Sequence, residues 1–155
     1  MSAPNASTRY LIPMLGPLYV RAQQFAYPIL RITLGAFFIP HGCQKLFSWF
    51  GGSIQATIDG MTKLGWQMPV FWAYYIGVLE VIGGALIVLG FLTRPIAALF
   101  VGFMFVATFF VHLRFGYFWT SRGAEMPLLL LMISIVVLMR GGGRYSLDRR
   151  FGREI

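Results

Sequence analysis

Apolar residues gather into four long stretches that polar or proline-containing segments separate. A membrane-spanning helix needs about 20 mostly apolar residues. The stretches at 24–47, 69–92, 95–113 and 123–140 approach or exceed this length, and we expect each of them to form a spanning helix. The pattern therefore predicts an all-α membrane protein, built as a bundle of four transmembrane helices.

Prolines and short connections mark the ends of these helices. Pro69 and Pro95 open the second and third stretches, where a missing backbone N–H costs no hydrogen bond. Only Thr93 and Arg94 connect these two stretches, so we expect a tight antiparallel hairpin. The longer connection at 51–68 has room for a short surface helix.

Basic residues are divided unequally between the two sides of this bundle. Four spans place both chain ends on one side, and basic residues favour the cytoplasmic side of membrane proteins. Both termini are therefore predicted to be cytoplasmic, with an N-terminal segment at 1–23, a transmembrane domain at 24–140 and a basic tail at 141–155. We expect the tail to contact anionic lipid. The terminal side carries Arg9, Arg21, Arg94, Arg140, Arg144, Arg149, Arg150 and Arg153, against Lys45, Lys63, Arg114 and Arg122 on the other.

Composition supports the prediction of a membrane protein and excludes two other classes of protein. Hydrophobic residues make up 57% of the 155 residues and charged residues 12%, whereas a soluble domain has about 25% charged residues. The mean hydropathy is +0.70. The single cysteine, Cys43, excludes a disulfide scaffold. The formal net charge of +8 would suggest nucleic acid in a soluble protein, but the distribution described above explains it, so we expect no nucleic-acid partner.

Two charged residues, Arg31 and Glu80, lie deep inside the apolar stretches. Such groups cost at least about 2.5–3.5 kcal/mol each at membrane depth, so they usually face a partner or a site. From the helix rise, Glu80 lies about 16 Å below the outer end of its helix, and Arg31 about 15 Å below His41. We expect an Arg31–Glu80 ion pair. A structural lock between two helices and a proton-accepting Glu80 are both open interpretations.

A second group of polar residues converges on the outer end of the bundle. Three of them share one face of the first helix, at positions i, i+3 and i+4. The convergence predicts a polar site for an anionic or quinone-like ligand. Simpler interpretations stay open, since Glu125 also suits a helix N-terminus and Lys45 can extend to the interface. The group comprises His41, Gln44, Lys45, His112, Arg114, Trp119 and Glu125.

Candidate catalytic residues are His41, Glu80 and His112. Two histidines on different helices could also ligate a haem, which we keep as an alternative to quinone. Zinc takes three or four protein ligands, and only His41, His112 and Glu125 are available, so we expect no metal site. We interpret Cys43 as a packed side chain.

The segments that contain these polar and charged residues resemble the DoxX family, over about residues 25–150. It implies a four-helix, multi-pass protein of a bacterial-type inner membrane. Some relatives are linked to quinone-dependent oxidoreductase complexes, and others resemble a membrane anchor for partner enzymes. The matching segments are GAFFIPHGCQKLF at 35–47, GVLEVIGG at 77–84, LGFLTR at 89–94, His112, GAE at 123–125 and GRYSLD at 143–148.

Three functions follow as hypotheses. The first is the membrane subunit of a respiratory or redox complex that binds quinone at the outer site; as an enzyme it would need a partner to supply electrons. The second is a non-catalytic anchor or scaffold for partner proteins, or a homo-oligomer. The third is a small-solute transporter, which an intramembrane Glu80 would suit.

Overall fold

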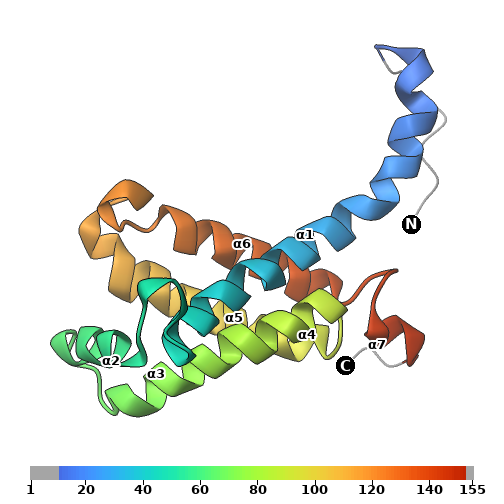
Figure 1. The fold of residues 1–155 in the computed structure, drawn as a ribbon. Helices are drawn as coiled ribbons and strands as arrows, with labels where there is room; N and C mark the ends of the chain where they lie inside the picture. The colour runs from blue at the N-terminus through green and yellow to red at the C-terminus, as the bar shows by residue number, and fades with distance from the viewer. Residues whose placement is uncertain (1–10, 153–155) are drawn as a thin grey trace.

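The computed structural model describes residues 11–152, and no strand occurs among them. Four long helical segments pack side by side (Figure 1). The prediction of an all-α protein is confirmed. The segments are α1 (Gly16–Leu46); α3 (Pro69–Val78), a π-helical turn (Leu79–Gly83) and α4 (Gly84–Leu89); α5 (Thr93–Val106) and a second π-helical turn (Ala107–His112); and α6 (Glu125–Arg140).

Two of these segments have the length and apolar composition expected of a membrane span. They are Pro69–Leu89 and Thr93–Phe115, which agree with the second and third predicted spans. The four-span count and the cytoplasmic position of both termini stay predictions. Residues 1–10 and 153–155 lie outside the described residues, and with them Arg9 and Arg153.

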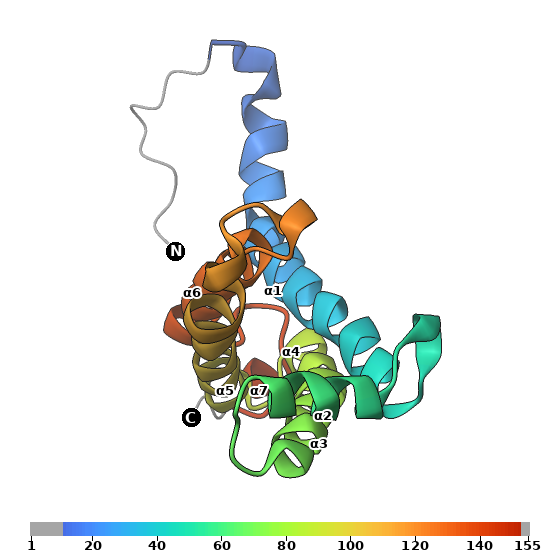
Figure 2. The same ribbon diagram turned by 90° about the vertical axis from the view of Figure 1, so that its left-hand side faces the viewer.

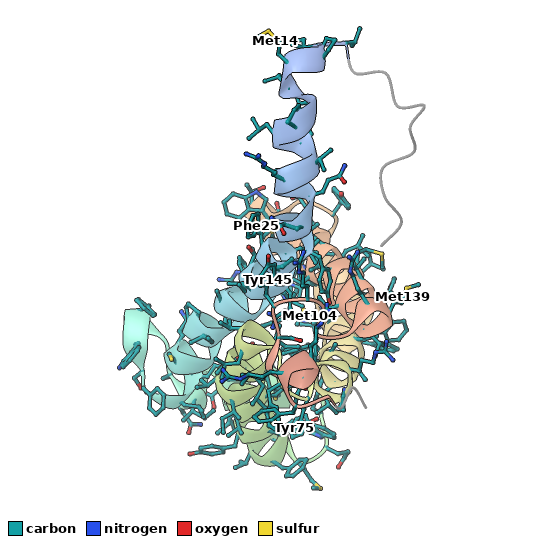
Figure 3. The ribbon with its side chains drawn as sticks, turned by 90° about the vertical axis from the view of Figure 1, so that its right-hand side faces the viewer. Met14, Phe25, Tyr75, Met104, Met139 and Tyr145 are labelled. Carbon is teal, nitrogen blue, oxygen red and sulfur yellow. The ribbon has the colours of Figure 1, made fainter. Side chains whose placement is uncertain are left out.

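Helix α1 has 31 residues and begins at Gly16, eight residues before the predicted start of the first span. Its N-terminal part projects away from the bundle (Figure 2). Met14, just before the helix, and Phe25 lie on this projecting part (Figure 3), and both side chains are exposed. Pro28 and Pro40 lie inside the helix.

Close backbone approach joins α1 to the antiparallel segment made of α3 and α4. A Cβ added at Gly35 would clash with the carbonyl oxygen of Gly84, and one at Gly42 would lie 2.8 Å from that of Gly77. Small residues permit this kind of packing between membrane helices. Gly77 and Gly84, on either side of Glu80 in the sequence, therefore let α1 approach the second segment closely.

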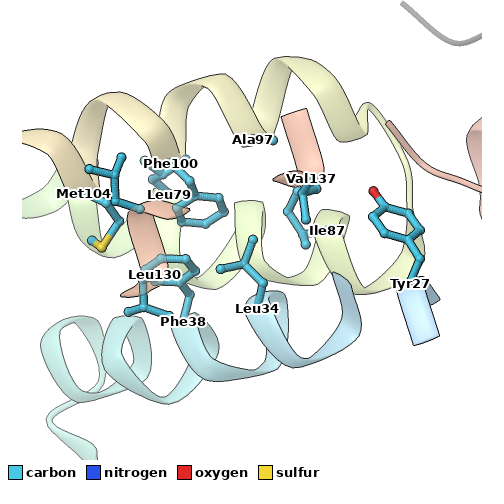
Figure 4. Close-up of a cluster of buried hydrophobic side chains, with 11 residues drawn as sticks. Tyr27, Leu34, Phe38, Leu79, Ile87, Ala97, Phe100, Met104, Leu130 and Val137 are labelled. Atoms are coloured by element: carbon cyan, nitrogen blue, oxygen red, sulfur yellow. The ribbon is translucent and has the colours of Figure 1, made fainter. Parts of the chain in front are cut away.

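The core lies between α1, α4, α5 and α6 (Figure 4). Phe38 and Phe100 stack in parallel at its centre, with ring centroids 4.0 Å apart. Helix α5 packs along α6 as α1 packs along α4. The buried members of the core are Tyr27, Leu34, Phe38, Leu79, Ile87, Ala97, Phe100, Met104, Leu130, Leu131 and Val137.

The connection between the second and third segments is short, as predicted, but it consists of Gly90, Phe91 and Leu92, because Thr93 and Arg94 already belong to α5. The C-terminal segment holds this connection in place. Asp148 accepts hydrogen bonds from the backbone N–H groups of Leu92 (2.7 Å) and Thr93 (2.9 Å). Its own N–H donates to the carbonyl of Gly90. Asp148, at the start of α7 (Leu147–Arg150), thereby caps the first turn of α5.

A short helix also forms in the connection at 51–68, as expected. Helix α2 (Ile54–Lys63) begins after Ser53, whose hydroxyl accepts a hydrogen bond from the N–H of Ala56 at 3.1 Å. Serine is a favoured residue at this capping position. The helix packs against α3 and supplies one wall of the cavity described below.

Candidate functional site

A cavity of about 770 Å³ opens at the end of the bundle where α1 ends and α6 begins. Its walls are formed by helices α1, α2, α3, α5 and α6, both π-helical turns and the loop after the third segment. Five of the seven residues predicted for the outer site line this one cavity, namely His41, Lys45, His112, Arg114 and Trp119. Glu80, which was predicted near the membrane centre, lines it as well. Whether they bind a ligand stays a prediction.

An ion pair between Lys45 and Glu80 is the most polar element of the cavity wall. The ammonium Nζ of Lys45 lies 2.9 Å from Oε1 and 2.7 Å from Oε2 of Glu80. Exposed fractions of the two side chains are 20% for Lys45 and 4% for Glu80. Lys45 also donates to the carbonyl of His41, one turn earlier in α1.

The predicted Arg31–Glu80 ion pair is wrong. Arg31 donates instead to three backbone carbonyls, those of Ile87 (2.6 Å), Val88 (3.1 Å) and Tyr145 (2.7 Å). Its side chain is buried. It therefore ties α1 to the end of α4 and to the C-terminal segment.

The prediction failed because the ends of the two helices are not level. It assumed that His41 and Pro69 reach the same depth, whereas Gly42 faces Gly77, eight residues after Pro69. Eight residues correspond to about 12 Å of helix. Glu80 consequently lies beside the end of α1, within reach of Lys45.

Both π-helical turns contribute to the cavity. Glu80 lies in the turn Leu79–Gly83, and His112 ends the turn Ala107–His112. Such turns are rare, and they occur frequently at functional sites. Neither turn was predicted, because no proline or other residue pattern marks them in the sequence.

The two histidines differ in how their rings are held. Nδ1 of His112 lies 2.6 Å from the carbonyl oxygen of Arg122. A carbonyl oxygen only accepts, so Nδ1 carries the hydrogen, and a neutral ring then offers Nε2 as an acceptor. The His41 ring packs against Phe37, with centroids 5.2 Å apart. His112 is therefore the more strictly oriented of the two rings.

Two predicted site residues do not line the cavity. Glu125 accepts a hydrogen bond from the backbone N–H of Trp119 at 3.0 Å, and it is the first residue of α6. Gln44 lies against Gly52, in the segment that follows α1. Both residues support the surrounding loops, and Glu125 in particular holds the loop that carries Trp119.

Helix α2 supplies lining residues that the sequence did not indicate as part of a site. Thr57, Met61 and Leu64 face the cavity, and Trp66 follows them. The spacing of three or four residues between them is typical of one face of a helix. Among the described residues, no group of three or more His, Cys, Asp or Glu side chains is placed to hold a metal ion.

The fold and this cavity define a small all-helical membrane protein, in which a few polar side chains line a mostly apolar cavity. The chain belongs to the DoxX family, whose model, DoxX, matches residues 26–113. The family resemblance of the sequence is thus confirmed, and it indicates a bacterial membrane protein.

Relatives of the chain are similar over most of their length. CatD of Bacillus subtilis, which carries the provisional name of an oxidoreductase, is 33% identical over 120 residues, covering 77% of this chain and 82% of CatD. The inner membrane protein YphA of Escherichia coli is 33% identical over 127 residues, covering 79% and 87% of the two chains. An uncharacterized membrane protein of Mycobacterium tuberculosis is 30% identical over 135 residues, covering 81% and 80%. No solved structure matches the chain significantly.

Proposed function

We propose that the cavity binds a quinone or its reduced form, and that the chain is the membrane subunit of a quinone-linked redox complex. The observation that carries this proposal is the cavity itself. Sites for small ligands usually have about 300–1,000 Å³ of apolar volume with a few converging polar groups. The volume of about 770 Å³ and the lining by His41, His112 and the Lys45–Glu80 pair fit that description.

Aromatic side chains suit the ring of such a ligand. Phe37, Phe38 and Trp119 line the cavity, and flat rings pack favourably against aromatic side chains in offset or edge-on arrangements. Trp66 lines the cavity from the side of α2. These four side chains would bind the ring, and polar groups would select its oxygen atoms.

His112 favours the reduced ligand. Because its Nδ1–H is engaged by the carbonyl of Arg122, the neutral ring presents an acceptor, which suits a hydroxyl group better than a carbonyl group. A hydroquinone hydroxyl would donate to Nε2 and could pass its proton there. The carboxylate of Glu80, hydrogen-bonded to Lys45, is the second proton acceptor that we propose for this site.

Two arguments support our proposal that the chain belongs to a redox complex: the chemistry of quinones and the name of one relative. Oxidation of a hydroquinone releases two electrons, for which we propose an acceptor on a partner subunit. The provisional oxidoreductase name of CatD agrees with such a role. We propose further that the chain crosses a bacterial inner membrane four times, with both termini in the cytoplasm, in keeping with its excess of arginine on that side.

Equilibrium binding tests the ligand assignment. Full-length protein in phosphatidylcholine nanodiscs would be titrated with decylubiquinone and, separately, with its hydroquinone. Quenching of tryptophan fluorescence reports binding, because Trp66 and Trp119 line the cavity. The variant His41→Ala/His112→Ala should bind at least about tenfold more weakly, as expected for the loss of two hydrogen bonds.

The matched control is Gln44→Ala, since Gln44 lies at the same end of α1 but outside the cavity. Its affinity should equal that of the unmodified protein. Saturable binding that is the same in all variants would contradict the proposed site. Absence of quinone binding, together with copurification of stable partner proteins, would favour the scaffold hypothesis instead.

A further inference from the structure

A second cavity, of about 570 Å³, lies at the opposite end of α6 from the first. It forms where the C-terminal segment folds back beside the middle of α1. Three arginines and no carboxylate line it, among the residues that the structure describes. The lining consists of Gln24, Tyr27, Pro28, Arg140, Gly143, Arg144 and Arg149.

Contacts within the wall hold this second cavity in shape. The guanidinium of Arg140 stacks over the ring of Tyr27, 4.6 Å from its centroid. The Tyr27 hydroxyl donates to the carbonyl of Gly141. Arg144 donates to Oε1 of Gln24 at 3.1 Å, and the hydroxyl of Tyr145 donates to the same oxygen at 3.2 Å. Arg140 and Arg144 are thereby attached to helix α1.

The acidic residue that precedes Arg149 in the sequence engages backbone groups elsewhere. Asp148 precedes Arg149, yet its carboxylate accepts from the backbone N–H groups of Leu92 and Thr93. The Asp148 side chain is buried there. Arg144 and Arg149 therefore bring positive charge to the second cavity, and guanidinium groups match phosphate oxygens in charge and in geometry.

We propose that the second cavity binds the phosphate headgroup of an anionic phospholipid. Arg140 is the last residue of α6, and basic residues at the end of a membrane helix lie at the level of the headgroups. Large apolar side chains adjoin the lining residues in the sequence and are exposed, namely Phe25, Ile29 and Met139. They offer contacts to acyl chains that a free phosphate ion could not use.

The test is a lipid titration of full-length protein in a neutral detergent, followed by native mass spectrometry. Phosphatidylglycerol and phosphatidylcholine are the two lipids compared. The site variant is Arg144→Gln/Arg149→Gln. Its control is Arg21→Gln/Arg150→Gln, which removes the same charge from exposed positions that do not line the cavity.

Phosphatidylglycerol should bind the unmodified protein more tightly than phosphatidylcholine does. The site variant should lose about tenfold or more of this affinity, since each arginine near an anionic headgroup contributes substantially. The control should change by less than about twofold. Equal losses in both variants would overturn the proposal, because they would show general charge attraction.

A third titration separates the lipid from free phosphate compounds. Glycerophosphoglycerol carries the same phosphodiester group without acyl chains, and we expect its binding to be undetectable at the lipid concentrations used. Binding as tight as that of the lipid would overturn the assignment to a phospholipid. Thermal unfolding of each variant checks that the fold is intact, and quinone binding at the first cavity should be unchanged.

Discussion

Lys45 donates to both carboxylate oxygens of Glu80, across the contact between α1 and the π-helical turn of the second segment. The pair lines the larger cavity, and the Glu80 side chain is only 4% exposed, so its charge depends on Lys45. A buried ion pair often contributes little net stability, but removing one member is costly because it leaves the other unpaired.

Lys45→Met should therefore destabilise the protein more than Glu80→Gln. The first leaves a carboxylate that is only 4% exposed, and the second leaves an ammonium that is 20% exposed and still reaches the cavity. We expect a loss of about 3 kcal/mol in the free energy of unfolding for Lys45→Met. The double variant should lose less than the sum of the two single losses. Unfolding by denaturant in mixed micelles measures all three, and strictly additive losses would contradict the pairing.

Asp148→Ala should destabilise the protein by about 1–2 kcal/mol, as expected for the loss of a helix-capping side chain. The carboxylate satisfies two N–H groups at the start of α5. Asp148→Asn keeps one acceptor and should lose less. Asp59→Ala is the control, since Asp59 is exposed and bonds only to Gln55 in its own helix. Equal unfolding temperatures for Asp148→Ala and Asp59→Ala would contradict the capping role.

Gly35→Ala should destabilise the packing of α1 against α4, because the added methyl would meet the carbonyl of Gly84. Overpacking of this kind costs about 1–3 kcal/mol. Gly102→Ala is the matched control in α5, where the added Cβ meets nothing within 4 Å. The control should be neutral, or stabilising by about 0.5–1 kcal/mol. The unfolding temperatures of the two variants should consequently change in opposite directions, or only the first should change.

His112→Asn tests the proposed preference for the reduced ligand. The side-chain amide of asparagine can still donate to the carbonyl of Arg122, but asparagine has no counterpart of the accepting Nε2 of His112. We expect the unmodified protein to bind the hydroquinone more tightly than the quinone, and the variant to bind both about equally. Separate titrations with the two forms measure this ratio. A hydroquinone preference that survives in the variant would exclude His112 as its cause.

Local sequence patterns predict the helices and several of the polar residues that line the larger cavity. Apolar runs bounded by Pro69 and Pro95 predict helices because both signals act within one segment. His41 and Lys45 lie one turn apart at the end of α1, and His112 ends the third segment, so helix geometry alone brings them to one end of the bundle. Five of the seven residues predicted for the outer site accordingly line one cavity.

Relationships between distant segments were not predictable in the same way. The register of α1 against α3 and α4 is determined by glycine contacts such as Gly42–Gly77, and a shift of eight residues decided that Glu80 meets Lys45 rather than Arg31. The π-helical turns depend on packing and leave no mark in the sequence. Asp148 caps a helix that begins 55 residues earlier, which no local pattern reveals.

The central claim is that the larger cavity is the ligand site, and filling it tests this most directly. Ala107 lines the cavity, whereas Ala98 is exposed on α5 outside it. Decylubiquinone titration of Ala107→Phe in phosphatidylcholine nanodiscs should show binding weakened by at least about tenfold, as the added ring occupies volume that the ligand needs. Ala98→Phe should bind like the unmodified protein. Unchanged affinity in a well-folded Ala107→Phe would contradict the proposed site.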